Sequence, residues 1–162
     1  MARMKSTAER GHFKQEIHTA LYKDKNIREL LLGDTSTQSA SKIKEDFKNH
    51  VKSHLFIDDT IIDTSSFIFY DVRMPSLSSN IKVCQIIMYA ICHRDILDNY
   101  EKDGYYGNRA DILSQMIEDC LINDKNVVNN FGIGELSLDS VDIYNAKRFY
   151  GCIMTFSVPN FR

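Results

Sequence analysis

The sequence predicts an α+β fold: a mainly antiparallel sheet of about five strands, a long helix packed on one face of the sheet and an N-terminal helical region. Three observations support this. Residues 81–92, IKVCQIIMYAIC, form the longest near-continuous apolar run. Apolar residues at helical spacing occur in 13–31 and 112–121, and alternating patterns close the chain. We expect residues 1–40, an N-terminal arm with helices, and residues 41–162, an α+β region, to form one structural unit.

Composition is that of a globular protein, and its charges nearly cancel, with 20 Lys and Arg against 22 Asp and Glu. No overall field therefore points to nucleic acid or membrane. The distribution is uneven: residues 1–54 hold 11 basic and 7 acidic side chains, and residues 55–162 hold 9 and 15. This asymmetry suits a subunit that meets its neighbours through one end. Residues 1–11 are predicted to be a loose arm.

The four cysteines lie within apolar runs and show no CxxC spacing. We interpret them as core residues of a protein in a reducing compartment. No signal peptide is predicted, because the polar N-terminus leads into no apolar segment. No apolar run reaches the length of about 20 residues that a membrane-spanning helix needs.

Three helices are predicted before the sheet. Apolar residues recur at helical spacing in 13–21 and 27–31, and the second helix is expected to end at Gly33. Ser39 or Ser41 can cap the third helix. These helices either cover part of the sheet or form an arm that docks on a neighbour.

The strands begin with residues 55–62 and 66–72, whose Ile, Phe and Thr content predicts a hairpin around a turn at 63–65. Residues 81–92 are apolar at both alternating sets of positions, which indicates a central strand covered on both faces. A buried helix has the same periodicity, but the Val, Ile and Tyr content and the preceding SLSSN favour a strand.

A helix over 108–123, capped by Asn108, carries an apolar stripe and should lie across one face of the sheet. Residues 135–158 then predict a terminal hairpin. Its apolar residues change parity near Asp139 and Ser140, which indicates a β-bulge. The last strand has a second face that is only half polar, so that face also needs a cover.

Two motifs were tested for chemistry and rejected on context. The HRDIL sequence at 93–97 resembles a kinase catalytic loop, but the asparagine is misplaced and the chain has no glycine-rich loop or DFG. His50 and His54 could share a helix face and bind zinc, but no HExxH pattern or third ligand accompanies them. A pair of surface histidines is the favoured interpretation.

An acidic cluster around two strands leaves a metal-dependent nuclease open as an alternative. It comprises Asp58, Asp59, Asp63 and Asp71, and Lys82 is the one candidate for the lysine that such a site also needs. Nothing in the sequence fixes the position of that lysine. We therefore predict no catalytic, cofactor-binding or metal-binding residues, and no enzyme activity.

The order of elements, the stretch VKSHLFIDDTIIDTSSFIFYDVRMP and the closing RFYGCIMTFSVPNF resemble small neck proteins of tailed phages, in particular the tail-terminator (tail-completion) family. The resemblance covers residues 40–160. It implies a structural virion protein that assembles in the host cytoplasm as a homo-hexameric ring at the top of the tail. The ring would bind the tail tube protein and the head-proximal connector protein, with DNA only passing through its lumen and no membrane contact. A head-closure or adaptor neck protein and an ordinary binding module are the alternatives.

A ring subunit would bury the second apolar face of its sheet against neighbours. The residues expected at such a subunit interface are Val83, Ile87, Tyr89, Phe149 and Ile153. Acidic side chains that face a channel would repel DNA phosphates. The candidates for this lumen-facing position are Glu135, Asp139 and Asp142.

Overall fold

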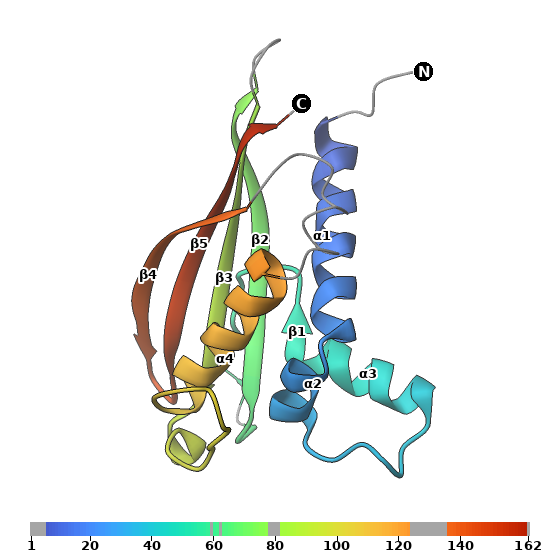
Figure 1. The fold of residues 1–162 in the computed structure, drawn as a ribbon, viewed down its shortest axis with the longest axis vertical. Helices are drawn as coiled ribbons and strands as arrows, with labels where there is room; N and C mark the ends of the chain where they lie inside the picture. Colours follow the sequence, from blue (N-terminus) through green and yellow to red (C-terminus); the bar gives the residue numbers. More distant parts are fainter. Residues whose placement is uncertain (1–5, 59, 62, 78–81, 124–135, 162) are drawn as a thin grey trace.

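The computed structural model describes residues 6–58, 60–61, 63–77, 82–123 and 136–161. Its sheet has five strands in the order β1-β2-β3-β5-β4, and Figure 1 shows α4 in front of the strands and α1 beside them. The strands are β1 (Val51–Lys52), β2 (Ser66–Leu77), β3 (Lys82–His93), β4 (Ser137–Ala146) and β5 (Phe149–Phe161). The α-helices are α1 (Ser6–Lys23), α2 (Lys25–Leu32), α3 (Ala40–His50) and α4 (Arg109–Glu118). Among the described strands, β1–β2 is the one parallel pair, so the predicted α+β fold with a mainly antiparallel sheet is confirmed.

Strand β3 occupies the central position that its sequence predicts. It pairs with β2 on one side and β5 on the other, both antiparallel. Cys84, Ile86, Met88 and Ala90 point from β3 into the core beneath the helices, and each is at most 1% exposed. The alternate residues of β3 lie on the other face of the sheet, because neighbouring residues of a strand point to opposite faces.

Helix caps lie where the sequence indicates. Gly33 ends α2 with φ 73°, and its N–H donates to the Glu29 carbonyl. Ser39, rather than Ser41, caps α3 by accepting from the N–H of Lys42. The first helix is longer than predicted. It begins at Ser6, so the expectation of a loose arm over residues 1–11 is wrong for 6–11, and residues 1–5 lie outside the described residues.

Helix α4 opens with a capping box, in which Asn108 and Asp111 each accept a hydrogen bond from the other's backbone N–H. It continues as a turn of π-helix over Asp119–Asn123, so the predicted helix over 108–123 is confirmed. Its buried side, including Leu113 and Met116, faces the sheet.

The predicted hairpin over 55–72 is wrong in its first half. Strand β1 is only two residues long, lies before the predicted strand and pairs with β2 in parallel. Within the part of 55–61 that the structure describes, no residue belongs to a strand. The Asp58 carboxylate accepts from the N–H and the hydroxyl of Thr60, which folds the segment into a turn. Its apolar side chains, Leu55, Ile57 and Ile61, pack on the sheet instead of extending it.

The terminal hairpin and its bulge are confirmed. Strands β4 and β5 pair in antiparallel fashion, with a register shift between Leu138 and Ser140 that leaves Asp139 as the extra residue. Lys147, with φ 53°, lies in the tight turn between them.

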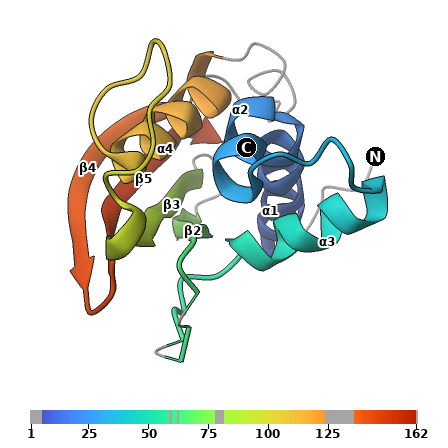
Figure 2. The same cartoon turned by 90° about the horizontal axis from the view of Figure 1, so that it is seen from below.

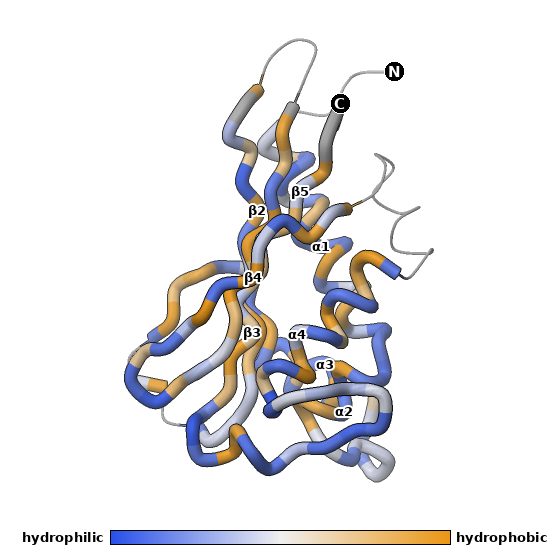
Figure 3. Tube along the Cα trace, turned by 60° about the vertical axis from the view of Figure 1, so that its left-hand side comes forward, coloured by the Kyte–Doolittle hydropathy of each residue, from blue (hydrophilic) through white to orange (hydrophobic). Residues whose placement is uncertain are grey.

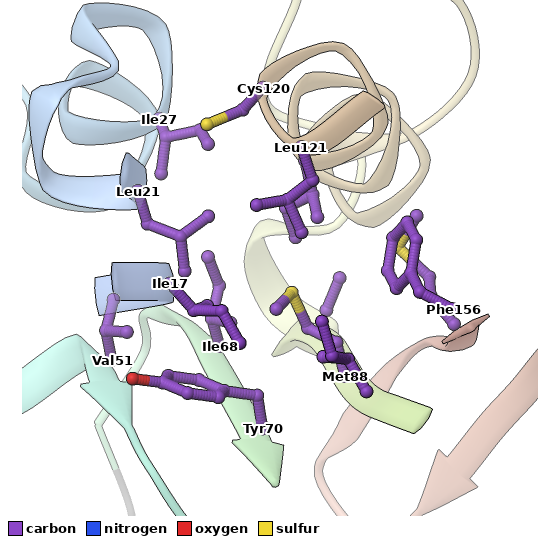
Figure 4. Packing of buried hydrophobic residues seen from close by; sticks show 14 of the residues in the cluster. Ile17, Leu21, Ile27, Val51, Ile68, Tyr70, Met88, Cys120, Leu121 and Phe156 are labelled. Atoms are coloured by element: carbon purple, nitrogen blue, oxygen red, sulfur yellow. The ribbon is translucent and has the colours of Figure 1, made fainter. Parts of the chain in front are cut away.

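One large core cluster joins the helices to the sheet. Figure 4 shows Leu21 of α1, Ile27 of α2 and Leu121 above Met88 of β3, and all four are fully buried. Burial of each such side chain contributes about 1.5–3 kcal/mol relative to exposure. Figure 2 shows α1 and α4 on the same side of β3. The N-terminal helices therefore share one hydrophobic core with the sheet.

Candidate interaction surface

The face of the sheet turned away from α1 and α4, called here the open face, carries the predicted interface residues. Tyr89 of β3 pairs with Ile153 of β5, and Ile153 pairs in turn with Asp142 of β4. Residues directly opposite in an antiparallel pair share a face, so all three lie on the open face. Ile87, two residues from Tyr89 on the same strand, lies there too.

One half of the open face is covered by the chain itself. Phe67, Phe69, Ile91 and Phe149 form a second buried cluster, against which Leu55, Ile57 and Ile61 pack. The rings of Phe67 and Phe149 meet edge to face at 5.8 Å. Phe149, predicted at a subunit interface, is only 5% exposed in this cluster.

The other half of the open face has no such cover among the described residues. Val83, Ile87, Tyr89 and Ile153, called here the apolar strip, are all half-buried. Figure 3 colours the chain by hydropathy, and most of β3 lies in the hydrophobic range. The Tyr89 ring contacts that of Tyr144 at 5.4 Å and marks the border between the two halves. The structure thus places four of the five predicted interface residues on the same face of the sheet, with Gln85 between Val83 and Ile87.

Strand β4 forms the outer edge of the sheet, and on that side no other strand of the described chain pairs with it. Asp139 and Asp142 are exposed on this strand, while Glu135 lies outside the described residues. On the opposite face of β4, Val141 and Ile143 are 54% and 73% exposed. Edge strands are normally protected by lysine, proline or a covering segment, and residues 137–146 contain no Lys, Arg or Pro.

The exposure of Val141 and Ile143 was missed from the sequence. Their register partners, Met154 and Cys152, place them on the same face as α4, where the apolar pattern predicts burial. The β-bulge, at which the apolar residues of this strand change to the other face, was the signal that could have identified Val141 and Ile143.

The two candidate zinc ligands do not act together. Helix α3 ends at His50, whose Nδ1 lies 2.9 Å from the Ser66 carbonyl oxygen while its ring stacks on Phe67. His54 lies beyond the helix, with its ring 6.0 Å from that of Phe69. Both rings pack beside the covered half of the open face. In the described part of the chain, no group of three or more His, Cys, Asp or Glu side chains could hold a metal ion.

The acidic cluster is likewise dispersed into structural roles. Asp71 contacts Lys14 at 2.8 Å and Arg10 at 2.5 Å, both on α1. Burial raises the pKa of Asp71, but the hydrogen bonds from Lys14 and from the Val72 N–H, together with the two cations, outweigh it and lower the pKa. The Asp58 carboxylate accepts a hydrogen bond from the Thr60 N–H within its own turn. Asp59 and the Lys82 side chain lie outside the described residues.

The thiols are protected by burial. Desolvation raises the pKa of Cys84 and of Cys92 to about 11, so both remain protonated at neutral pH. Among the residues that the structure describes, no helix is long and apolar enough to cross a membrane.

Comparison with known proteins assigns the chain to a family. No curated protein matches it. The model of the YomW family, which is phage-derived, matches residues 15–158, and this span runs from within α1 to near the end of β5. The family indicates a phage-associated protein. Because the match covers most of the 162 residues, the chain belongs to the YomW family.

Proposed function

We propose that the chain is a structural subunit of a tailed phage or phage-like particle, a ring-forming tail terminator that joins the tail tube to the head-proximal connector. Its partners would be further copies of itself, the tail tube protein and the connector protein, and its place the neck of the virion after assembly in the host cytoplasm. DNA would pass through the ring, and we propose no catalytic role. The phage-derived family supports the general assignment.

The observation that carries the proposal is the apolar strip on the open face. When one face of an antiparallel sheet meets water, that face normally carries polar residues. Here the central strand presents Val83 and Ile87 on a half that no described segment covers, with Tyr89 at its border. A neighbouring molecule that covers the strip would remove this apolar surface from water, at about 25 cal/mol per Å².

The strip is too small to hold an assembly alone. Stable protein interfaces bury roughly 800 Å² on each partner, or about 20–30 residues. Four half-buried side chains supply only part of that area, so the contact must extend over neighbouring surface. A head-closure or adaptor protein, which would use the same face at another position in the neck, is the second candidate.

Two lysine substitutions on the same face of β3 test the proposal. Ile87 is half-buried in the strip, whereas Ile91 is fully buried beneath residues 55–61. We expect Ile87→Lys to remain folded by circular dichroism and to lose assembly, followed by native mass spectrometry and electron microscopy. Ile91→Lys, the matched control, should unfold.

Three outcomes decide the matter. Loss of assembly with an intact fold in Ile87→Lys supports the ring subunit. Unfolding of Ile87→Lys would make the strip internal core and remove the argument. A wild-type chain that stays monomeric and is absent from purified particles by mass spectrometry would contradict the proposed function itself.

A further inference from the structure

A basic groove lies between α1, α3 and β1, at the β1 end of the strand order. It has a volume of about 560 Å³ and is lined by Lys14, His18, Lys48, Lys52, His54 and Tyr70, among others. Among the residues that the structure describes, no Asp or Glu lines it. In the strand order β1-β2-β3-β5-β4, the groove and the acidic strand β4 are at opposite edges of one sheet.

The positive charge of the basic groove is largely uncompensated. Lys14 is paired with Asp71 at 2.8 Å, but Lys48 and Lys52 have no ion-pair partner among the residues that the structure describes. Burial, and then the nearby Lys48 ammonium, lower the pKa of His18, which also lines the groove.

Strand β4 offers the complementary surface. Its outer edge leaves backbone N–H and C=O groups unpaired by any described strand, and Asp139 and Asp142 are exposed along it. The Asp139 carboxylate accepts from Ser137 Oγ at 2.9 Å, and no basic residue lies between 137 and 146 to neutralise either Asp. Val141 and Ile143 add exposed apolar surface to the same strand.

We propose that copies of this chain associate head to tail, with the β4 edge of one copy bound at the basic groove of the next. This inference rests on the proposed function, because it names a contact between subunits in addition to the apolar strip. Since the two surfaces lie at opposite edges of the sheet, the contact is heterologous, and repeated contacts of this kind form a ring when the rotation closes. Asp139 and Asp142 then belong to the subunit contact rather than to the channel wall.

Other pairings of β4 are less favourable. Two β4 edges related by a two-fold axis would bring the carboxylates of two copies together, and like charges across a strand pair are destabilising. Direct pairing with the outer edge of β2 is obstructed by α1, because Arg10 Nε donates to the Val72 carbonyl at 2.6 Å. The Tyr70 hydroxyl of β2 also donates to the Lys14 carbonyl at 2.8 Å. The groove beside that edge therefore remains as the complementary partner.

A charge exchange tests the contact. The first variant carries Lys48→Glu and Lys52→Glu, and the second carries Asp139→Lys and Asp142→Lys. Each alone places like charges across the contact, so we expect assembly to require on the order of tenfold higher concentration or to fail. An equimolar mixture restores opposite charges at every contact of an alternating ring and should recover assembly. Lys25→Glu with Lys44→Glu, the control, makes the same change in net charge outside the groove.

Circular dichroism establishes that each variant is folded, and native mass spectrometry follows assembly. Recovery in the mixture, with the control assembling as the wild type does, supports the contact. Assembly by each variant alone, or no recovery in the mixture of folded variants, overturns the contact and leaves the proposed function standing. Binding of labelled duplex DNA that the Lys48→Glu, Lys52→Glu variant loses, with its assembly unchanged, would identify the groove as a phosphate-binding surface and also overturn it. A wild-type chain that never associates and is absent from particles contradicts the proposed function instead.

Discussion

Replacement of Arg109 by Met should lower the free energy of unfolding more than replacement of an exposed arginine does, because Arg109 links the N-terminal helices to the sheet. Arg109, at the start of α4, donates from Nε to Ser66 Oγ at 2.7 Å and from a terminal nitrogen to the Leu30 carbonyl at 2.6 Å. Its guanidinium also lies 5.1 Å from the centre of the Tyr100 ring. The Leu30 carbonyl is in the last turn of α2, where helix geometry leaves carbonyls without a partner inside the helix.

The expected loss is about 2–4 kcal/mol of unfolding free energy. Each hydrogen bond to a charged group contributes about 1.5–3 kcal/mol, and the cation–π contact adds about 0.5–1 kcal/mol. Against this, Met avoids the cost of burying a charge, a cost that is seen in the lowered pKa of Arg109. Urea unfolding, with a slope of roughly 2 kcal/mol per molar, should move its midpoint down by about 1–2 M.

Arg94→Met is the control, because Arg94 also donates to a backbone carbonyl, that of Lys147 at 2.9 Å, but in an exposed position. It should cost about 0.5 kcal/mol or less. Arg109→Lys should recover only part of the loss, since a single ammonium cannot reproduce the fork that serves two acceptors. If Arg109→Met and Arg94→Met unfold at the same urea concentration, the linking role assigned to Arg109 is wrong.

Two further predictions concern the backbone of β5 and the acid sensitivity of the fold. Gly151→Ala should lower the free energy of unfolding by about 1–3 kcal/mol, measured by urea unfolding, because the new β-carbon would overlap the Ala90 carbonyl. Gly11→Ala, whose β-carbon would have nothing within 4 Å, should stabilise the fold by about 0.5–1 kcal/mol. Equal effects of the two substitutions would contradict the close approach of Gly151 to β3. The lowered pKa of Asp71 means that its ion pairs stabilise the fold above the unfolded value of about 3.9 and are lost as pH falls through the folded value. The stability gap between wild type and Asp71→Asn, about 1 kcal/mol at pH 7, should therefore shrink as pH falls below the unfolded value of about 3.9. A gap independent of pH would refute this.

Several elements could be predicted because a local rule and the tertiary structure agree. Asn108 followed by Asp111 specifies a capping box whatever surrounds it, and the structure has that box. The parity change near Asp139 can be read directly as an extra residue, and the register confirms it. The apolar residues at both alternating sets of positions in β3 predicted a central strand, and β3 lies between β2 and β5.

The 55–61 segment shows where such reasoning fails. Its Ile and Phe residues have high strand propensity, but propensity describes a fit to a half-buried, pleated surface rather than a backbone preference. Leu55, Ile57 and Ile61 achieve burial by lying on the sheet, while Asp58 and Thr60 close a turn that a strand would not allow. Pairing in the sheet and packing on it bury similar side chains, so composition alone does not separate them. The same ambiguity hid the short parallel strand β1.

The open face makes this distinction matter for function. The sequence predicted that both alternating sets of β3 residues are buried. It did not show whether the second set is covered by another segment of this chain or by another copy. The structure divides the answer within one strand: the chain's own 55–61 segment covers Ile91, and four residues earlier Ile87 is left half-exposed. A lysine at position 91 must therefore be accommodated within the monomer. A lysine at position 87 contacts a neighbouring molecule only if one binds there. The comparison of Ile91→Lys with Ile87→Lys separates internal core from intermolecular contact because face, strand and chemical change are the same in both variants.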